Sequence, residues 1–317
     1  MRQAFASTLA DLADKDPRVL LLTGDLGYMA LEPFSDRFPD RFFNCGVAEQ
    51  NMVGVATGLA EAGFLPFCYS IATFATLRPY EMIRNGPIAQ ELPVRIVGVG
   101  GGFEYGHNGL SHYPLEDVGV MRLQPGIAVL APADHEQART ALLASWNLPG
   151  PVYYRLGKDD RTIVPGLDGR FELGRAQVIR EGSEVVLFSL GPAALDALTA
   201  ANSLVQVGVK ATVCVVASLN PVPSGDLVEL LSSHSLAVSV EAHYVNGGVG
   251  SLVAELIAEG GLDCRLVRCG VRSTPDGHSG SQATLETLHG IGPEKVVESV
   301  LAGLGGSRLE TVTRPRP

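Results

Sequence analysis

Glu49 stands near the start of a helix predicted over residues 47–61, where a carboxyl group could take part in proton transfer. Its position also has a plain explanation, because the helix dipole stabilises an acidic side chain at a helix N-terminus. Gly54, Gly58 and Ala62 recur at four-residue spacing, although a glycine inside a helix costs up to about 1 kcal/mol relative to alanine. We therefore expect another chain to approach this face closely and to leave Glu49 in a water-poor crevice, where a carboxyl group can share a proton with a weak base.

Several stretches of the chain carry a long and specific pattern. They are GVAEQNMVGVATGLA (46–60), SIATFATLRPYEMIRN (70–85), GHNGLSHYPLEDVGVMRLQPGIAVLAPAD (106–134), VYYRLGK (152–158) and EAHYVNGGVGSLVAE (241–255). This pattern resembles the transketolase family and its relative 1-deoxyxylulose-5-phosphate synthase, over roughly residues 2–304. The resemblance implies a pyrimidine-binding domain, a transketolase C-terminal domain and thiamine diphosphate as the cofactor.

The resemblance assigns cofactor contacts to four residues. In the family, a glutamate forms a hydrogen bond with N1′ of the cofactor's aminopyrimidine, and Glu49 matches it. Phe74 is similar to the aromatic residue that stacks on the pyrimidine, although such a phenylalanine is otherwise a core residue. Asp25 and Leu26 resemble residues that face the cofactor, whereas Ile71 replaces an additional aromatic residue.

Substrate contacts are implied in the same way. His112 aligns with a histidine that contacts the donor's reacting hydroxyl and carbonyl groups, where an imidazole can relay a proton; otherwise it would be a surface residue. Asn108 stands where an aspartate usually recognises the α-hydroxyl of the substrate, and an amide can donate as well as accept. Arg2 and Arg155 match two arginines that clamp a sugar phosphate, with a structural ion pair as the alternative for Arg155.

Two further phosphate contacts of the family are missing. Met29 replaces a serine, and Gly100 replaces a histidine. Neither a thioether nor a bare backbone can supply the lost side-chain hydrogen bonds. The sequence therefore leaves two alternatives open: the substrate is shorter or not phosphorylated, or other groups such as His107 or Tyr105 take over.

The segment that holds the cofactor's diphosphate is absent. The family binds the diphosphate and its divalent ion with a Gly-Asp-Gly motif followed by an asparagine, and this chain has no such motif. Its Gly24-Asp25 pair lies in the first predicted strand instead. The resemblance thus implies a split transketolase in which an N-terminal partner subunit carries the motif and holds Mg²⁺ (or Ca²⁺), while this chain binds no metal. We expect an α2β2 heterotetramer with self-association of this chain, acting on a sugar or a sugar-phosphate-like substrate.

Alternating apolar strands and amphipathic helices must position these residues. The pattern predicts an α/β protein with two doubly wound sheets. We expect a pyrimidine-binding domain at 1–157, a linker at 158–174, the C-terminal domain at 175–304 and a flexible tail at 305–317. Strands are predicted over 19–25, 64–70, 94–100, 126–132, 152–157, 184–191, 210–217, 236–242 and 264–270. Helices are predicted over 2–15, 47–61, 134–146, 193–206, 225–232, 248–258 and 293–302.

Composition narrows the class of protein. The 317 residues suffice for two domains, and a formal charge of −10 argues against nucleic-acid or anionic-membrane binding. Five cysteines without a CxxC pair indicate buried thiols in a reducing compartment, which places the protein in the cytoplasm. The N-terminal segment lacks an apolar signal core, and no apolar stretch approaches the ~18 residues of a membrane span.

Three other classes of protein share parts of this pattern. A 2-oxoacid dehydrogenase β subunit shares the two-domain plan, but the AEQN and GHNGLSH contexts argue against it. A 1-deoxyxylulose-5-phosphate-synthase-like carboligase stays open as an alternative. An inactive partner subunit would not need Glu49, Phe74 and His112 together. That alternative stays open because of Asn108, Met29 and Gly100. A Rossmann oxidoreductase is disfavoured because no GxGxxG follows the first strand.

Overall fold

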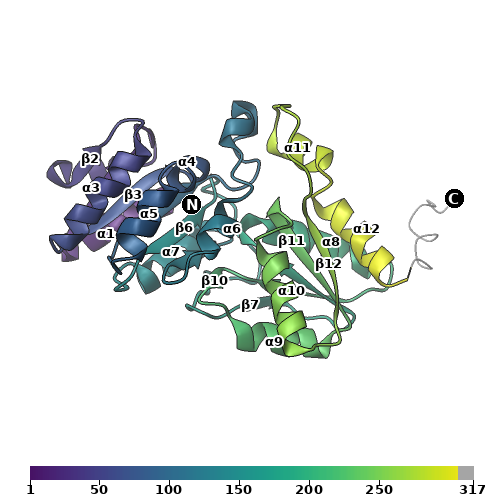
Figure 1. Cartoon of the computed structure of the whole chain (residues 1–317). Coiled ribbons are helices and arrows are strands. Elements are labelled where there is room, and N and C mark those ends of the chain that lie inside the picture. The colour runs from purple at the N-terminus through teal and green to yellow at the C-terminus, as the bar shows by residue number, and fades with distance from the viewer. Residues whose placement is uncertain (306–317) are drawn as a thin grey trace.

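Two β-sheets flanked by helices make up residues 1–305, the part of the chain that the computed structural model describes (Figure 1). The first sheet has seven strands in the order β10-β5-β6-β4-β3-β1-β2, and the second has five in the order β12-β11-β8-β9-β7. Strands β10 and β7 are antiparallel to their neighbours, while the other pairs are parallel. The predicted α/β class is confirmed. Apart from Gly305, the predicted tail at 305–317 lies outside the described residues.

The boundaries of the elements agree closely with the apolar pattern. The strands are β1 (Val19–Thr23), β2 (Phe42–Asn44), β3 (Leu65–Ile71), β4 (Arg95–Val99), β5 (Ala128–Leu130), β6 (Val152–Leu156), β7 (Gln177–Arg180), β8 (Val185–Ser189), β9 (Ala211–Val215), β10 (Ser218–Asn220), β11 (Leu236–Tyr244) and β12 (Arg265–Val271). The α-helices are α1 (Arg2–Lys15), α2 (Glu32–Ser35), α3 (Glu49–Glu61), α4 (Ala72–Thr76), α5 (Tyr80–Ile83), α6 (Asp117–Arg122), α7 (His135–Ser145), α8 (Ala194–Val205), α9 (Ser224–Ser233), α10 (Val249–Gly260), α11 (Gln282–Leu288) and α12 (Pro293–Gly303). The predicted strands and long helices are all present, with ends that differ by a few residues.

The predicted site residues gather at one edge of the first sheet. Strands β1, β2, β3, β4 and β6 run parallel, so the loops that follow their carboxyl ends meet at the same edge. The segments after these strands carry Asp25 and Leu26 (after β1), Glu49 at the start of α3 (after β2), Phe74 in α4 (after β3), and Asn108 and His112 (after β4). Lys158, which was not predicted, follows β6. The strands themselves are largely buried.

The two sheets are joined by more than the connecting segment. Residues 158–174 form turns and irregular backbone, and the chain then enters β7 of the second sheet. Later, β10 returns to the first sheet and pairs with β5, with Ser218 opposite Leu130. Helix α11 lies beside the loop after β4, where the Gly280 N–H donates to the Gly106 carbonyl at 3.1 Å (Figure 1).

The described residues include no helix with the length and apolar character needed to cross a membrane. All five cysteines are free thiols, and four of them are buried, as predicted. Cys45 is the half-buried exception.

Candidate active site

The carboxylate of Glu49 is enclosed at the first residue of α3, with a side chain only 1% exposed. Ser70 Oγ, at the end of β3, donates to Oε1 at 2.9 Å. A Cβ atom built on Gly24 would lie 3.0 Å from the same oxygen, so the absence of a side chain there makes room for the carboxylate. On the other side, Arg78 Nη1 donates to Oε2 at 2.7 Å. The helix dipole alone therefore does not explain this residue, because specific side chains surround and bind the carboxylate.

Phe74 and His112 meet beside this carboxylate. Their ring centroids are 5.0 Å apart and the planes are inclined at 73°, an edge-to-face contact. The Arg78 guanidinium lies over the face of Phe74, with Cζ 3.9 Å from the ring centroid. Burial, and secondarily the charge of Arg78, lower the pKa of His112 below its ordinary value. His112 is therefore a neutral imidazole at pH 7, able to hold one proton and accept another.

A row of cationic and aromatic groups continues from His112 to the N-terminal helix. The ring centroids of His112 and Tyr105 are 6.4 Å apart, and Lys158 Nζ lies 4.7 Å from the Tyr105 centroid. Arg2 Nε donates to the Lys158 carbonyl at 3.1 Å. The sequence prediction missed Lys158, although its place two residues after β6, which ends at the same edge of the sheet, was a usable signal.

The two residues predicted to face the cofactor from the loop after β1 directly follow Gly24, which lies beside the Glu49 carboxylate. Asp25 is exposed, adopts a φ of 59° and accepts from Asn44 Nδ2 at 2.8 Å. Leu26 is half-buried, and its carbonyl accepts from Thr23 Oγ1. Asn108 ends the short 3-10 helix Gly106–Asn108, where its side chain is exposed on the loop that carries His112.

Arg155 belongs to a buried hydrogen-bond network and not to the row formed by His112, Tyr105, Lys158 and Arg2. Its side chain is 3% exposed, and Nε donates to Asp117 Oδ2 at 3.0 Å. Nη2 donates to the carbonyls of Pro114 and Ala242, both at 3.0 Å. The structural ion pair that the sequence left open as the alternative for Arg155 is thus the observed arrangement. The network joins β6 of the first sheet to β11 of the second.

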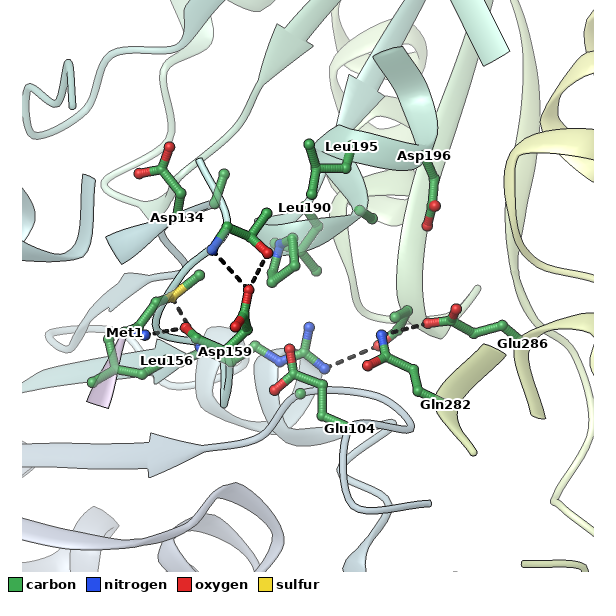
Figure 2. A pocket seen from close by; sticks show the side chains of 18 residues that line it. Met1, Glu104, Asp134, Leu156, Asp159, Leu190, Leu195, Asp196, Gln282 and Glu286 are labelled. Carbon is green, nitrogen blue, oxygen red and sulfur yellow. Dashed lines mark hydrogen bonds between the residues drawn. The ribbon is translucent and has the colours of Figure 1, made fainter. Parts of the chain in front are cut away.

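A cavity of about 330 Å³ lies between the two sheets, next to Arg155 (Figure 2). Glu104, Asp196 and Glu286 converge on it from three different parts of the chain, as Figure 2 shows. Burial raises the pKa of Glu104 and of Glu286 to about 7 and that of Asp196 to about 6. A neighbouring cavity of about 470 Å³, lined by Arg2 and Lys158, shares Glu104 with it. The edge of the first sheet that carries the candidate site is therefore connected by these two cavities to the boundary between the domains.

One face of α3 is uncovered in the single chain. A Cβ atom built on Gly54 or Gly58 would meet nothing within 4 Å. Apolar side chains beside this face are exposed, including Val47 (71%), Val55 and Met82. The close approach expected at these glycines is thus not made within the chain itself, which leaves the face open to another chain.

The chain is similar to known proteins over most of its length. Residues 1–162 match the family model "Transketolase, pyrimidine binding domain", and residues 174–296 match "Transketolase, C-terminal domain". An apulose-4-phosphate transketolase subunit of Actinobacillus succinogenes is 33% identical over 86% of this chain and 88% of its own length. The 6-deoxy-6-sulfo-D-fructose transketolase subunit SqwH of Clostridium sp. is 33% identical over 94% of this chain and 92% of its own length.

A solved structure described as a split-gene transketolase in an inactive β4 tetramer superposes with a TM-score of 0.87. It is 38% identical and covers 96% of this chain and 97% of its own. The likeness thus extends over both domains and the boundary between them.

Proposed function

Because this chain belongs to the transketolase family and spans its pyrimidine-binding and C-terminal domains in order, we propose that it is the C-terminal subunit of a split thiamine-diphosphate-dependent transketolase. Such an enzyme transfers a two-carbon ketol unit from a ketose donor to an aldehyde acceptor. The enclosed carboxylate of Glu49 beside Phe74 and His112 is the observation that carries the proposal. Relatives that are transketolase subunits favour this reaction over that of a 2-oxoacid dehydrogenase.

The residues at the site edge fit an aminopyrimidine. One flat group, the Arg78 guanidinium, reaches both Glu49 Oε2 and the face of Phe74, and Gly24 leaves the wall beside Glu49 Oε1 without a side chain. When bound, thiamine diphosphate supplies a nucleophilic carbon that the twenty side chains lack. Glu49 would hold a proton at the pyrimidine N1′, and Phe74 would orient the ring by stacking.

His112 would act on the substrate rather than on the cofactor. Its ring lies between Phe74 and Tyr105, so it stands between the proposed cofactor site and the cationic row. Because its lowered pKa keeps it neutral at pH 7, the imidazole can accept a proton from a substrate hydroxyl and return it. Asn108, on the same loop, would form a hydrogen bond with a hydroxyl near the reacting carbon.

The anionic end of a substrate would meet Arg2, Lys158 and Tyr105. These groups line one continuous stretch that leads away from His112. Arg155, which the sequence prediction placed in this role, already makes three hydrogen bonds within the fold. We assign it to the domain boundary and place Lys158 in the anion-binding role. Since these groups differ from the family's usual set, the acceptor would differ from the common pentose phosphates.

A partner subunit must complete the enzyme. The chain has no Gly-Asp-Gly motif with its following asparagine, so an N-terminal transketolase subunit would hold the diphosphate and Mg²⁺. The uncovered glycine face of α3 supports self-association of this chain within an α2β2 heterotetramer. The free cysteines suit a reducing compartment such as the cytoplasm.

Calorimetry tests the split directly. Titrating thiamine diphosphate and Mg²⁺ into the purified chain should give weak binding or none, because most charge-assisted contacts of the cofactor are to its diphosphate and metal. Adding the subunit from the same organism that carries the Gly-Asp-Gly motif should give tight binding and ketol transfer. Tight binding by the isolated chain would disprove the split.

A further inference from the structure

The guanidinium of Arg78 makes the same two contacts that the proposed function assigns to the aminopyrimidine. It donates to Glu49 Oε2 at 2.7 Å, and its Cζ lies 3.9 Å above the centroid of Phe74. An aminopyrimidine and a guanidinium are both flat groups that present nitrogen to a carboxylate and a face to an aromatic ring. They cannot occupy the same space between Glu49 and Phe74 at once.

Of the groups around Glu49, Arg78 is the one that can leave. Ser70 is buried at the end of β3, and Gly24 contributes only backbone. Arg78 lies in the turn between α4 and α5, its side chain is 41% exposed, and it has a long, flexible stem. The departure of Arg78 would uncover both Glu49 Oε2 and the face of Phe74.

Without a cation, the buried Glu49 carboxylate would have only the Ser70 hydroxyl as a partner. A buried charge without an opposite charge is unfavourable. We propose that Arg78 occupies the place of the aminopyrimidine in the cofactor-free subunit, where it neutralises Glu49 and covers the face of Phe74, and that it swings out when the cofactor binds. Arg78 therefore competes with the cofactor for its own site. This inference rests on the proposed function.

The test uses the complex of this chain with its diphosphate-binding partner. Calorimetric titration with thiamine diphosphate and Mg²⁺ measures cofactor affinity. Thermal denaturation without cofactor measures the melting temperature. Arg78→Ala should bind thiamine diphosphate three- to tenfold more tightly than the parent, because the competitor is gone. The same variant should lower the melting temperature of the cofactor-free complex, and Glu49→Gln added to it should restore that temperature. Arg84→Ala, which removes an exposed arginine that pairs only with its neighbour Asn85 among the described contacts, should change neither value.

Arg78→Lys provides the test if the alanine variant does not fold. An ammonium keeps the ion pair but cannot stack as a plane, so affinity should fall between those of the parent and Arg78→Ala. Equal or weaker cofactor binding in Arg78→Ala, or weaker binding in Arg78→Lys, would overturn the inference. If the parental complex binds no cofactor, the proposed function itself fails, and the two failures are therefore distinguishable.

Discussion

The ring of Tyr105 fills the space beside Gly100, where a Cβ atom built on the glycine would lie 2.1 Å from Tyr105 Cε2. Position 100 is where the resemblance led us to expect a histidine that contacts phosphate. A φ of 82° at Gly100 also favours glycine. Tyr105 thus stands in the place of the missing side chain, with its ring beside Lys158 Nζ.

Replacing Tyr105 with phenylalanine should weaken the binding of a phosphorylated acceptor while the ring still fills the site. Loss of one hydrogen bond, worth about 1 kcal/mol, predicts a KM about fivefold higher for ribose 5-phosphate and no change for ribose. Steady-state kinetics of the two-subunit enzyme would measure this. Tyr28→Phe removes a hydroxyl from an exposed ring and serves as the control. An equal change for both acceptors would show that Tyr105 does not contact the phosphate.

Lys158→Met should lower kcat/KM for a phosphorylated acceptor by about tenfold or more, since a charge-assisted contact is lost. Lys15→Met, at the exposed end of α1, should leave kcat/KM unchanged. Arg155→Met should instead destabilise the fold by about 3–5 kcal/mol, because it leaves Asp117 buried without its cation. Urea denaturation separates the two effects. If Arg155→Met folds normally and loses phosphate preference, the assignments of Lys158 and Arg155 must be exchanged.

Glu49→Gln should abolish exchange of the C2 proton of bound thiamine diphosphate, because an amide cannot hold the proton at N1′ that the carboxyl group shares. Deuterium exchange in the reconstituted complex, followed by NMR, measures the rate. Glu61→Gln, at the exposed C-terminal end of the same helix, is the matched control. Exchange at the parental rate in Glu49→Gln would remove Glu49 from the mechanism.

Gly58→Leu should disrupt self-association without harming the chain itself. A Cβ atom built at this position would meet nothing within 4 Å, and leucine suits a helix better than glycine by several tenths of a kcal/mol. Sedimentation velocity should therefore show a smaller particle with an unchanged circular dichroism spectrum. Gly225→Leu, also in open space but on α9, should keep the parental assembly. Unaltered assembly in Gly58→Leu would place the interface elsewhere.

Stability should decline in acid because of His243. This residue is buried; its Nε2 accepts from the Gly119 N–H at 3.2 Å, and its Nδ1 pairs with the Tyr244 carbonyl. Burial lowers its pKa to about 4. Between pH 6.5 and 4, this histidine is therefore protonated in the unfolded chain but stays neutral in the folded chain. The free energy of unfolding should fall by about 3 kcal/mol over that range.

His243→Gln keeps an acceptor but does not titrate, so its profile should be flatter over the same range. Urea denaturation at several pH values would measure both profiles. Other titrating groups contribute equally to the two proteins. Parallel profiles would show that His243 takes up its proton freely in the folded state.

The sequence predicted the sheets and long helices because buried strands and amphipathic helices leave a clear apolar pattern. It did not predict short elements such as β7, β10 and α11, of four, three and seven residues, since such elements depend on tertiary partners. Glu49, Phe74 and His112 were predicted from motif resemblance, and the fold brings them together. Arg78 was missed because an arginine four residues after an aromatic carries no local signal. The burial of Arg155 against the second sheet likewise depends on a contact between residues far apart in the chain.

The pairing of β10 with the first sheet has a consequence for folding. Because β10 of the second half forms the outer strand of the first sheet, the first domain cannot complete its hydrogen-bonded ladder until the chain beyond residue 218 has been made. A fragment cut at the 158–174 segment would expose the unpaired backbone of β5, an open edge that invites pairing with another molecule. We expect such a fragment to aggregate, and the two halves to unfold as one cooperative unit rather than in two separate transitions.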